Sequence, residues 1–239
     1  MTTPAPRWRM PAEWEPHDAT WIAWPHHAPD WPDKLEAIHW VYAEIVRVLA
    51  EHERVDILCH TEALRAQATY YLQAHAVKMH HVHLHLTPTD RVWLRDSAPT
   101  FIWTQTGAVE LMAWDFNAWA KYDNYHHDHE VPAAIHTLTT YPITRPTRPD
   151  AHPLVLEGGG IDVNGTGRIM VTEEWLLSDT QVRNPGLTRQ DYEQAFAHYL
   201  GCPSTIWLGA GCAGDDTHGH IDDIARFVTA DTVVLAYEA

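Results

Sequence analysis

The sequence predicts an α+β protein in which short strands and helices alternate along the chain. Between residues 35 and 49, apolar side chains recur every three or four positions, which is the spacing of one buried helix face. Asn164-Gly165 separates two short apolar runs, at residues 160–163 and 168–172, and such a pair is typical of a β-hairpin. A helix and a further strand follow, so we expect residues 160–208 to form a ββαβ unit.

The first half of the chain supplies more elements of the same kinds. Thr61 is placed to cap a helix that reaches about Ala76. Histidines alternate with apolar residues from His81 to Leu86, which predicts a half-buried strand with its imidazoles in solvent, although such a row could also bind metal. A hairpin is expected around Thr106-Gly107. The expected strands are 19–24, 54–59, 81–86, 100–103 and 109–114.

The second half ends with a helix and three strands. Thr188 is expected to cap a helix that ends near Leu200, where Gly201 can adopt the left-handed conformation that stops a helix. No stretch is rich enough in Gly, Ser or Pro to divide the chain, so residues 1–239 are expected to form a single domain. The expected strands after the helix are 205–208, 224–228 and 232–237.

Length, charge and cysteine content limit the kinds of partner. The chain has 239 residues and a mass of 27.3 kDa, enough for a sizeable core, and its formal charge is −16. This excess of acidic groups disfavours nucleic acid and anionic membranes as partners and attracts cationic small molecules. No apolar run approaches the length of a membrane span. Three cysteines without metal-type spacing, Cys59, Cys202 and Cys212, favour free thiols and a cytoplasmic location.

The segment from Gly211 to Asp223 is rich in Gly, Asp and His. If its last part is extended, the side chains of His218, His220 and Asp222 project on one face, because side chains alternate along a strand. The carboxylate could then hold a cation while an imidazole moves a proton. Two other interpretations are a polar surface loop and a metal-dependent amidohydrolase site that uses His218 and His220.

Two further acidic residues lie among turn-forming residues. Asp96 precedes Ser-Ala-Pro, and Glu157 precedes three glycines, which allow a positive φ or the close approach of a ligand. A guanidinium group is planar and always charged, so Asp96 and Asp222 from different loops could bind one through paired hydrogen bonds. Without a cation, two buried aspartates would repel each other and raise a carboxyl pKa. Such a pair therefore selects for a cation.

Several segments together resemble one known family. They are Met10-Pro-Ala-Glu-Trp-Glu-Pro16, Trp21-Ile-Ala-Trp-Pro25, Trp93-Leu-Arg-Asp-Ser-Ala-Pro-Thr100, Trp114-Asp-Phe-Asn-Ala-Trp119, Lys121-Tyr122, Glu157-Gly-Gly-Gly160, Arg183-Asn-Pro185 and Asp216-Thr-His-Gly-His-Ile-Asp222. In this order they resemble the motifs of the agmatine deiminases, which are close to the bacterial peptidylarginine deiminases. The resemblance covers residues 11–236, nearly the whole chain.

The resemblance implies a pentein fold, in which five ββαβ modules surround a pseudo-fivefold axis with the site at the centre. It also implies hydrolysis of agmatine to N-carbamoylputrescine and ammonia, a reaction of polyamine biosynthesis, with no metal and no organic cofactor. By the same resemblance, Asp96 and Asp222 bind the guanidinium and His220 is the acid and base. It likewise implies that Glu157 orients His220 and holds one substrate nitrogen. A cysteine thiolate of the family attacks the guanidinium carbon.

Two further residues are expected to contact the substrate. Trp93 would flank its methylene chain, and Asp216 would face its distal amine. The motifs suit arginine and peptidyl-arginine as well as agmatine. A non-catalytic guanidine- or polyamine-binding module, or a pseudoenzyme, is the alternative function. A homo-oligomer is expected if the chain is a natural short protein, because an open ring would leave strand edges unpaired.

The sequence departs from the family pattern in two respects. The family's catalytic cysteine lies in a Gly-rich segment well past the His-x-Asp motif, and this chain ends at Ala239. We therefore expect that the cysteine lies outside these residues, that the pentein lacks its last one or two modules, and that the isolated chain is inactive. Ala98 and Ala120 replace glycines of the pattern, and each is strained if its φ is positive.

Overall fold

The computed structural model describes residues 8–237, which form two compact units. The smaller unit contains residues 16–94 and 124–131, and the larger unit contains residues 8–15, 95–123 and 132–237. Within residues 8–237, no helix is both long enough and apolar enough to cross a membrane. The expected single domain over residues 1–239 stays a prediction, and its first seven and last two residues lie outside the described part.

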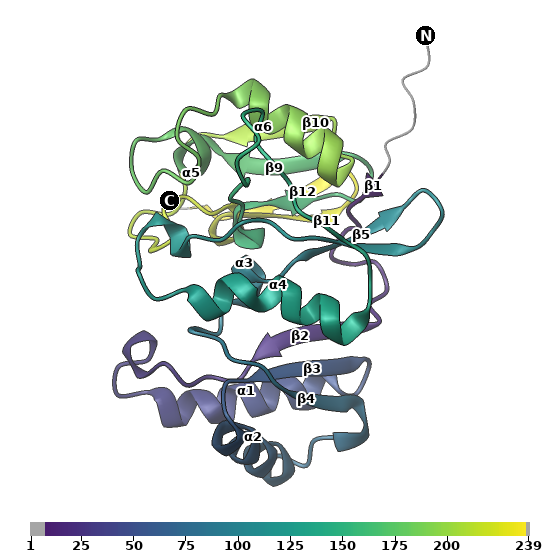
Figure 1. The fold of residues 1–239 in the computed structure, drawn as a ribbon, viewed down its shortest axis with the longest axis vertical. Coiled ribbons are helices and arrows are strands. Elements are labelled where there is room, and N and C mark those ends of the chain that lie inside the picture. The colour runs from purple at the N-terminus through teal and green to yellow at the C-terminus, as the bar shows by residue number, and fades with distance from the viewer. Residues whose placement is uncertain (1–7, 238–239) are drawn as a thin grey trace. The chain divides into compact units, whose positions relative to one another are not determined.

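The smaller unit is a parallel sheet with helices on one face (Figure 1). The sheet has the strand order β2 (Ala19–Ala23), β3 (Arg54–Cys59) and β4 (Val82–Leu86). The helices that pack on it are α1 (Leu35–Leu49) and α2 (Glu62–Ala74). Two short 3₁₀ turns are η1 (Ala28–Asp30) and η2 (Met79–His81). The core between sheet and helices includes Trp24, Ile57 and Leu72.

The local signals in this unit gave the correct helices. α1 has the bounds that the apolar periodicity predicts. Thr61 caps α2 as expected, since its hydroxyl accepts the backbone N–H of Leu64 at 3.2 Å. The helix ends at Ala74, close to the expected Ala76.

The row of histidines differs from the expected solvated face. His83 is exposed, but His81 lies in η2 and not in the strand. His85 Nε2 lies 2.7 Å from Asp56 Oδ1, on the neighbouring strand β3, and its ring stacks on Trp21. The buried carboxylate of Asp56 therefore accounts for the position of His85.

In the larger unit, the first sheet contains the hairpin expected around Gly107. Its strand order is β1 (Trp8–Arg9), β5 (Thr100–Thr104), β6 (Val109–Met112) and β7 (Ile143–Thr144). β5 and β6 are antiparallel, and Gly107 has the positive φ of 77° that their turn requires. The helical segments adjoining these strands in sequence are α3 (Leu94–Ser97), η3 (Ala118–Ala120) and α4 (His126–Thr139).

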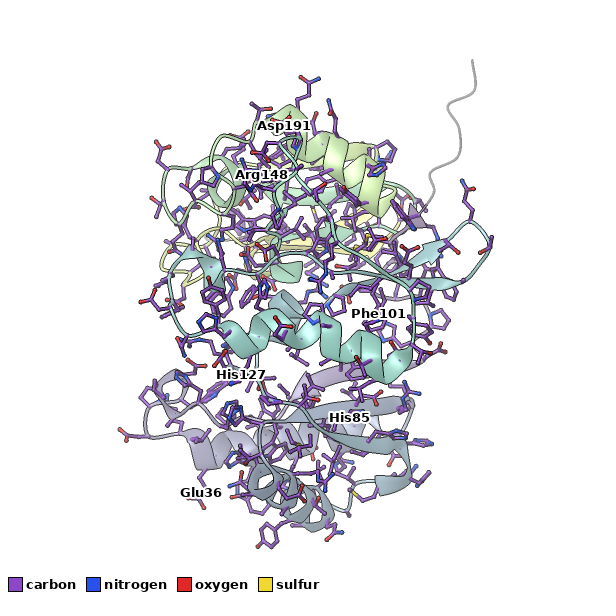
Figure 2. The ribbon with its side chains drawn as sticks, in the orientation of Figure 1. Glu36, His85, Phe101, His127, Arg148 and Asp191 are labelled. Atoms are coloured by element: carbon purple, nitrogen blue, oxygen red, sulfur yellow. The ribbon has the colours of Figure 1, made fainter. Side chains whose placement is uncertain are left out.

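The expected ββαβ unit is confirmed in the second sheet. Its order is β10 (Ser204–Leu208), β9 (Arg168–Thr172) and β8 (Asp162–Val163), with α5 (Glu173–Leu177), α6 (Arg189–Ala195) and the π-helical turn η5 (Phe196–Leu200) between β9 and β10. Thr188 caps α6 reciprocally with Asp191, which Figure 2 labels in its first turn. Gly201 ends η5 with a φ of 69°.

The turn between β8 and β9 differs from the type I′ turn expected at Asn164-Gly165. Gly165 and Gly167 have positive φ, but Asn164 does not. Instead, Asn164 Oδ1 accepts the backbone N–H groups of Thr166 and Arg168 at 2.9 and 3.0 Å. The asparagine therefore shapes a longer connection through its side chain, as Asn often does in turns.

The last elements of the larger unit are a hairpin and two short turns. They are η4 (Gly158–Gly160), η6 (Ile221–Asp223), β11 (Ala225–Thr229) and β12 (Thr232–Leu235). β11 pairs with β12 in antiparallel fashion, and the inward side chains of β11 pack on Met170 and Ile221. η4 and η6 lie next to each other, and this contact brings the candidate site together.

Candidate active site

Three polar groups of the larger unit converge beside Gly159. A Cβ atom at this position would lie 2.7 Å from His220 Nδ1, 2.8 Å from Asp96 Oδ1 and 2.9 Å from Asp222 Oδ2. Real Cβ contacts are almost never that short, so any side chain at residue 159 would displace these groups. The glycine therefore leaves the convergence point open, as the Gly-rich sequence after Glu157 suggested.

Asp96 is fixed by hydrogen bonds to both of its oxygens. It lies in the short helix α3, and Oδ1 accepts the backbone N–H of Gly159 at 2.9 Å. Oδ2 accepts the indole N–H of Trp119 at 2.9 Å. Gly158 is equally constrained, because a Cβ there would lie 2.1 Å from the carbonyl oxygen of Arg95. The Asp96 side chain thus contacts the backbone of Gly159, and the Arg95 backbone lies directly against the backbone of Gly158.

His220 and Glu157 form the buried pair that the sequence predicts. His220 Nε2 lies 3.3 Å from Glu157 Oε2, and Glu157 is fully buried. The same carboxylate oxygen accepts the indole N–H of Trp175 at 2.7 Å, and the Trp175 ring meets the imidazole edge to face. The other imidazole nitrogen, Nδ1, lies 3.9 Å from Asp96 Oδ1. Nε2 therefore binds the carboxylate that orients the ring, while Nδ1 is directed to the convergence point.

The backbone around His220 is a turn, so the condition of an extended segment from His218 to Asp222 is not met. His218 has a positive φ of 63°, and Asp222 lies in the 3₁₀ turn η6. The carboxylate of Asp215 accepts the backbone N–H groups of Thr217, Gly219 and His220, at 2.8, 2.8 and 3.1 Å. This side chain favours the turn, because it offers the backbone local partners. The strand expected from residue 224 follows as β11.

The turn separates the two histidines that a metal site would need together. His218 Nε2 lies 3.0 Å from the hydroxyl of Ser178, and its Nδ1 lies 3.6 Å from Glu174. His220 instead contacts Glu157. Across residues 8–237, no group of three or more His, Cys, Asp and Glu side chains is arranged to hold a metal ion.

Burial and charge shift the acidic groups in different directions. Burial raises the pKa of Asp96, and the charge of His220 opposes this only in part. Asp222 is exposed as a residue, but loss of water around its carboxyl, with the charge of Asp96, raises its pKa to about 6. For Glu157, burial alone would raise the pKa, but the charge of Arg183 and the hydrogen bond with His220 lower it.

The surroundings of His220 favour the charged form of its imidazole. Burial would lower its pKa, but the hydrogen bond to Glu157 and the charge of Asp96 outweigh burial and raise it. The charges of His220 and Arg95 lower the pKa of Asp222, but loss of water and the charge of Asp96 outweigh them. Asp96 and Asp222 are therefore only partly neutralised by the protein's own cations.

Two residues of this cluster carry no role in the sequence analysis. Arg183 was noted only within the segment Arg183-Asn-Pro185, and its Nε lies 3.1 Å from Glu157 Oε1 with both side chains fully buried. Trp175 lies in α5, whose two-glutamate start gives no sign of a buried indole. A buried carboxylate needs donors, and this requirement is the only signal that points to Trp175, whereas Arg183 also lies in a family motif.

Trp93 and Asp216, the expected substrate contacts, lie in different surroundings. Trp93 belongs to the smaller unit, where its half-exposed ring packs against Trp31 with centroids 5.5 Å apart. Asp216 is exposed and forms an ion pair with Lys121, while its other oxygen accepts the hydroxyl of Tyr122 at 2.8 Å. The contact of either residue with a substrate stays a prediction.

Comparisons with known proteins agree with these features. The family model described as Porphyromonas-type peptidyl-arginine deiminase matches residues 9–239. The chain is 33% identical to a putative agmatine deiminase of Pectobacterium atrosepticum, over 95% of this chain and 59% of that protein. It is also 33% identical to an agmatine deiminase of Pseudomonas aeruginosa, over 99% of this chain and 62% of that protein.

Solved structures extend the likeness to the fold. An agmatine deiminase of Enterococcus faecalis matches with a TM-score of 0.86 at 26% identity, over 97% of this chain and 61% of that one. The α+β pentein fold expected from the sequence is thereby confirmed. The chain spans roughly three fifths of the length of these relatives, between 59% and 62%. It belongs to the Porphyromonas-type peptidyl-arginine deiminase family.

Proposed function

We propose that the protein to which this chain belongs is a hydrolase that deiminates agmatine to N-carbamoylputrescine and ammonia. The observation that carries the proposal is the convergence of Asp96, Asp222 and His220 beside Gly159. Two carboxylates there can accept N–H groups of one planar guanidinium. The pKa values of Asp96 and Asp222 are raised, so both carboxylates favour a further cation, and a guanidinium carries a positive charge at every physiological pH.

The proposed roles follow from the hydrogen bonds of each group. Asp96 and Asp222 bind the guanidinium nitrogens, and Glu157 holds the imidazole of His220 through Nε2. A thiolate adds to the guanidinium carbon, and the C–N bond to one amino group then breaks. His220, whose pKa is raised by its surroundings, gives that nitrogen the proton it needs to leave as ammonia. The imidazole then takes a proton from the water that cleaves the C–S bond and leaves the ureido product.

The three cysteines of this chain bear on the source of the thiolate. Cys59 and Cys202 are buried, and burial raises the pKa of each thiol to about 12. Neither thiol forms a thiolate at neutral pH. Cys212 is exposed in the loop before His220. We keep as proposals that the nucleophile lies outside these 239 residues and that the isolated chain does not turn over.

The remaining features of the function are also proposals. Agmatine is preferred to arginine and peptidyl-arginine if Asp216 faces the distal amine and Trp93 flanks the methylene chain. We propose a cytoplasmic protein on the free state of all three cysteines, Cys59, Cys202 and Cys212. We also propose that the protein forms a homo-oligomer. A guanidine-binding module without catalysis is the second candidate, favoured by the burial of Cys59 and Cys202.

Calorimetry on the 239-residue chain tests the proposal. Agmatine is titrated into the wild type and into Asp96→Asn, and putrescine serves as a ligand that has the amine but no guanidinium. We expect binding of agmatine alone and a loss of at least about tenfold in Asp96→Asn, because a charged hydrogen bond is removed. Asp150→Asn is the matched control, since Asp150 is an exposed aspartate paired with Arg148. Equal affinity for putrescine, or an unchanged affinity in Asp96→Asn, would contradict a guanidinium site.

A product assay separates the two candidate functions. Formation of ureido product that is abolished by His220→Ala would show turnover by the chain itself and would refute the expected inactivity. Binding of agmatine without product is the expected result for the isolated chain. If the intact protein from its native cells also binds agmatine without forming product, the binding-module function replaces the enzyme.

A further inference from the structure

The side chain of Arg183 contacts several parts of the candidate site. This side chain is fully buried, and its three nitrogens donate hydrogen bonds to three different segments. Nε donates to Glu157 Oε1 at 3.1 Å, Nη1 donates to the carbonyl of Gln181 at 2.8 Å, and Nη2 donates to the carbonyl of Thr217. A guanidinium group can serve three acceptors at once because its donors point in fixed directions within one plane.

These contacts assign different tasks to the two oxygens of Glu157. Oε1 is bound by Arg183, while Oε2 accepts from Trp175 at 2.7 Å and contacts His220 at 3.3 Å. Rotation of the carboxylate would break the contact with Arg183. The arginine therefore keeps Oε2 directed to the imidazole.

The same arginine also fixes the segment that carries the imidazole. Thr217, whose carbonyl accepts from Arg183, lies in the Asp215 turn that leads directly into His220. Both partners of the Glu157–His220 hydrogen bond are thus attached to one side chain. Loss of these contacts would let the carboxylate and the imidazole move independently.

We propose that Arg183 is a positioning residue, which sets the geometry of the Glu157–His220 pair by binding the carboxylate and the Thr217 carbonyl together. The proposal deepens the proposed function, since His220 is the acid and base of that reaction. It concerns a property of the resting protein that can be measured without substrate. Its failure is therefore distinguishable from a failure of the deiminase proposal.

The pKa of His220 reports this geometry, and two effects on it have opposite signs. Loss of a positive charge at residue 183 would by itself raise the imidazole pKa, because a like charge is removed. Loss of the oriented Glu157 oxygen would lower it, because the hydrogen bond to Glu157 counters the effect of burial. Arg183→Lys keeps the charge but loses the planar fork, so it isolates the second effect.

The experiment is an NMR titration of the imidazole Cε1–H groups in the substrate-free chain, with His220 assigned by its absence in His220→Asn. We expect Arg183→Lys to lower the His220 pKa by at least about one pH unit, the low end of a neighbouring-charge effect. Arg148→Lys is the matched control, since Arg148 also binds a carboxylate and a backbone carbonyl, those of Asp150 and Pro185. It should leave the His220 pKa unchanged. Figure 2 labels Arg148.

A double-mutant cycle shows whether Arg183 acts through Glu157. Glu157→Gln should lower the His220 pKa the most, and adding Arg183→Lys to it should change nothing further. A lower melting temperature with an unchanged His220 pKa in Arg183→Lys would mean a purely structural ion pair. An equal effect of Arg183→Lys in both backgrounds would also overturn the proposal.

A second variant keeps the test valid if Arg183→Lys does not fold. Glu157→Gln/Arg183→Gln removes both buried charges, and removal of both partners is tolerated far better than removal of one. Its His220 pKa should lie at or above that of Glu157→Gln alone, because only the like charge at residue 183 is lost in addition. A pKa more than about half a pH unit below that of Glu157→Gln alone, comparable to a weak charge effect, would contradict action through Glu157.

Discussion

Two acidic regions of the larger unit differ in whether the protein neutralises them. Around Asp216, the chain supplies its own cation, since Lys121 pairs with the carboxylate and Tyr122 donates to it. Burial would raise the pKa of Asp216, but these hydrogen bonds outweigh it and lower it. Beside Gly159, the pKa values of Asp96 and Asp222 are raised.

The contrast indicates where a ligand cation has most to contribute. A carboxylate that already has a lysine gains little from another cation, because the new contact replaces an existing one. Two carboxylates that nearby cations only partly neutralise gain a partner and lose mutual repulsion when a ligand cation arrives. Asp96 and Asp222 are therefore expected to dominate binding, and Asp216 to modulate it.

Closing the convergence point should have the largest effect. In Gly159→Ala, the added methyl group lies within 3 Å of His220, Asp96 and Asp222, so these groups must move apart. A displacement of about 1 Å costs about 100-fold in affinity or rate at a site that depends on geometry. We expect calorimetry to show at least this loss for agmatine.

A matched glycine provides the control for this change. Gly209 has no atom within 4 Å of its Cβ position and no positive φ. Gly209→Ala should bind agmatine like the wild type. If both variants bind normally, the guanidinium does not sit between Asp96 and Asp222.

Agmatine affinity should rise with pH up to about 6, the pKa of Asp222. Below that pH the carboxyl is protonated in the free protein, and binding of a cation must displace the proton. Affinity should then fall about tenfold for each pH unit, as expected for one linked proton. Calorimetry between pH 4.5 and 7.5, on the order of three pH units, measures the slope.

The stability of the folded protein without ligand should fall as the pH rises, whereas the affinity for agmatine rises. A folded-state pKa above the ordinary value of 3.8 means that the folded protein binds this proton more tightly than the unfolded chain does. The contribution of Asp222 to stability is therefore fully present below about pH 4 and is lost as the pH rises through about 6. Asp222→Asn should remove both pH dependences. An unchanged slope in this variant would assign the proton to another group.

Asp216→Asn should have a smaller and more selective effect. Because Lys121 must give up its partner to a substrate amine, the net gain from this contact is that of a surface ion pair, about 1 kcal/mol at most. We expect agmatine affinity to fall by up to about fivefold, which is the equivalent of that energy. Butylguanidine, which lacks the amine, should bind equally well to both proteins. An equal loss for both ligands would exclude a role in reading the distal amine.

The sequence predicted the regular elements well where the signal was local. The helix 35–49, the caps at Thr61 and Thr188, and the ββαβ unit depend on spacing and on single capping residues. The site was harder to predict. His220 and Glu157 were expected to meet, but the turn that aims His220 is built by Asp215, whose hydrogen bonds override strand geometry.

The long-range contacts of Glu157 could also not be predicted from the sequence. Arg183 and Trp175 reach Glu157 from 26 and 18 residues away, with strands and turns in between, so no single helix or strand relates them. Burial of the carboxylate implied that donors must exist, but it did not say which. The family motifs located Arg183, whereas its three contacts required the fold.

The smallest predicted effect is on the free energy of unfolding, at the two alanines that replace family glycines. One of them serves as the control for the other. Ala120 ends a run of three left-handed residues in η3, with a φ of 52°, whereas Ala98 has no positive φ. A left-handed non-glycine residue costs about 1–2 kcal/mol, and the extra chain entropy of glycine offsets part of this. Ala120→Gly should therefore raise the free energy of unfolding by up to about 1 kcal/mol, measured by urea denaturation. Ala98→Gly should lower it by about 0.5–1 kcal/mol, since only the entropic cost remains. If both changes destabilise the protein, contacts of the Ala120 methyl group outweigh the backbone strain, and the left-handed run that presents Trp119 to Asp96 is held by packing.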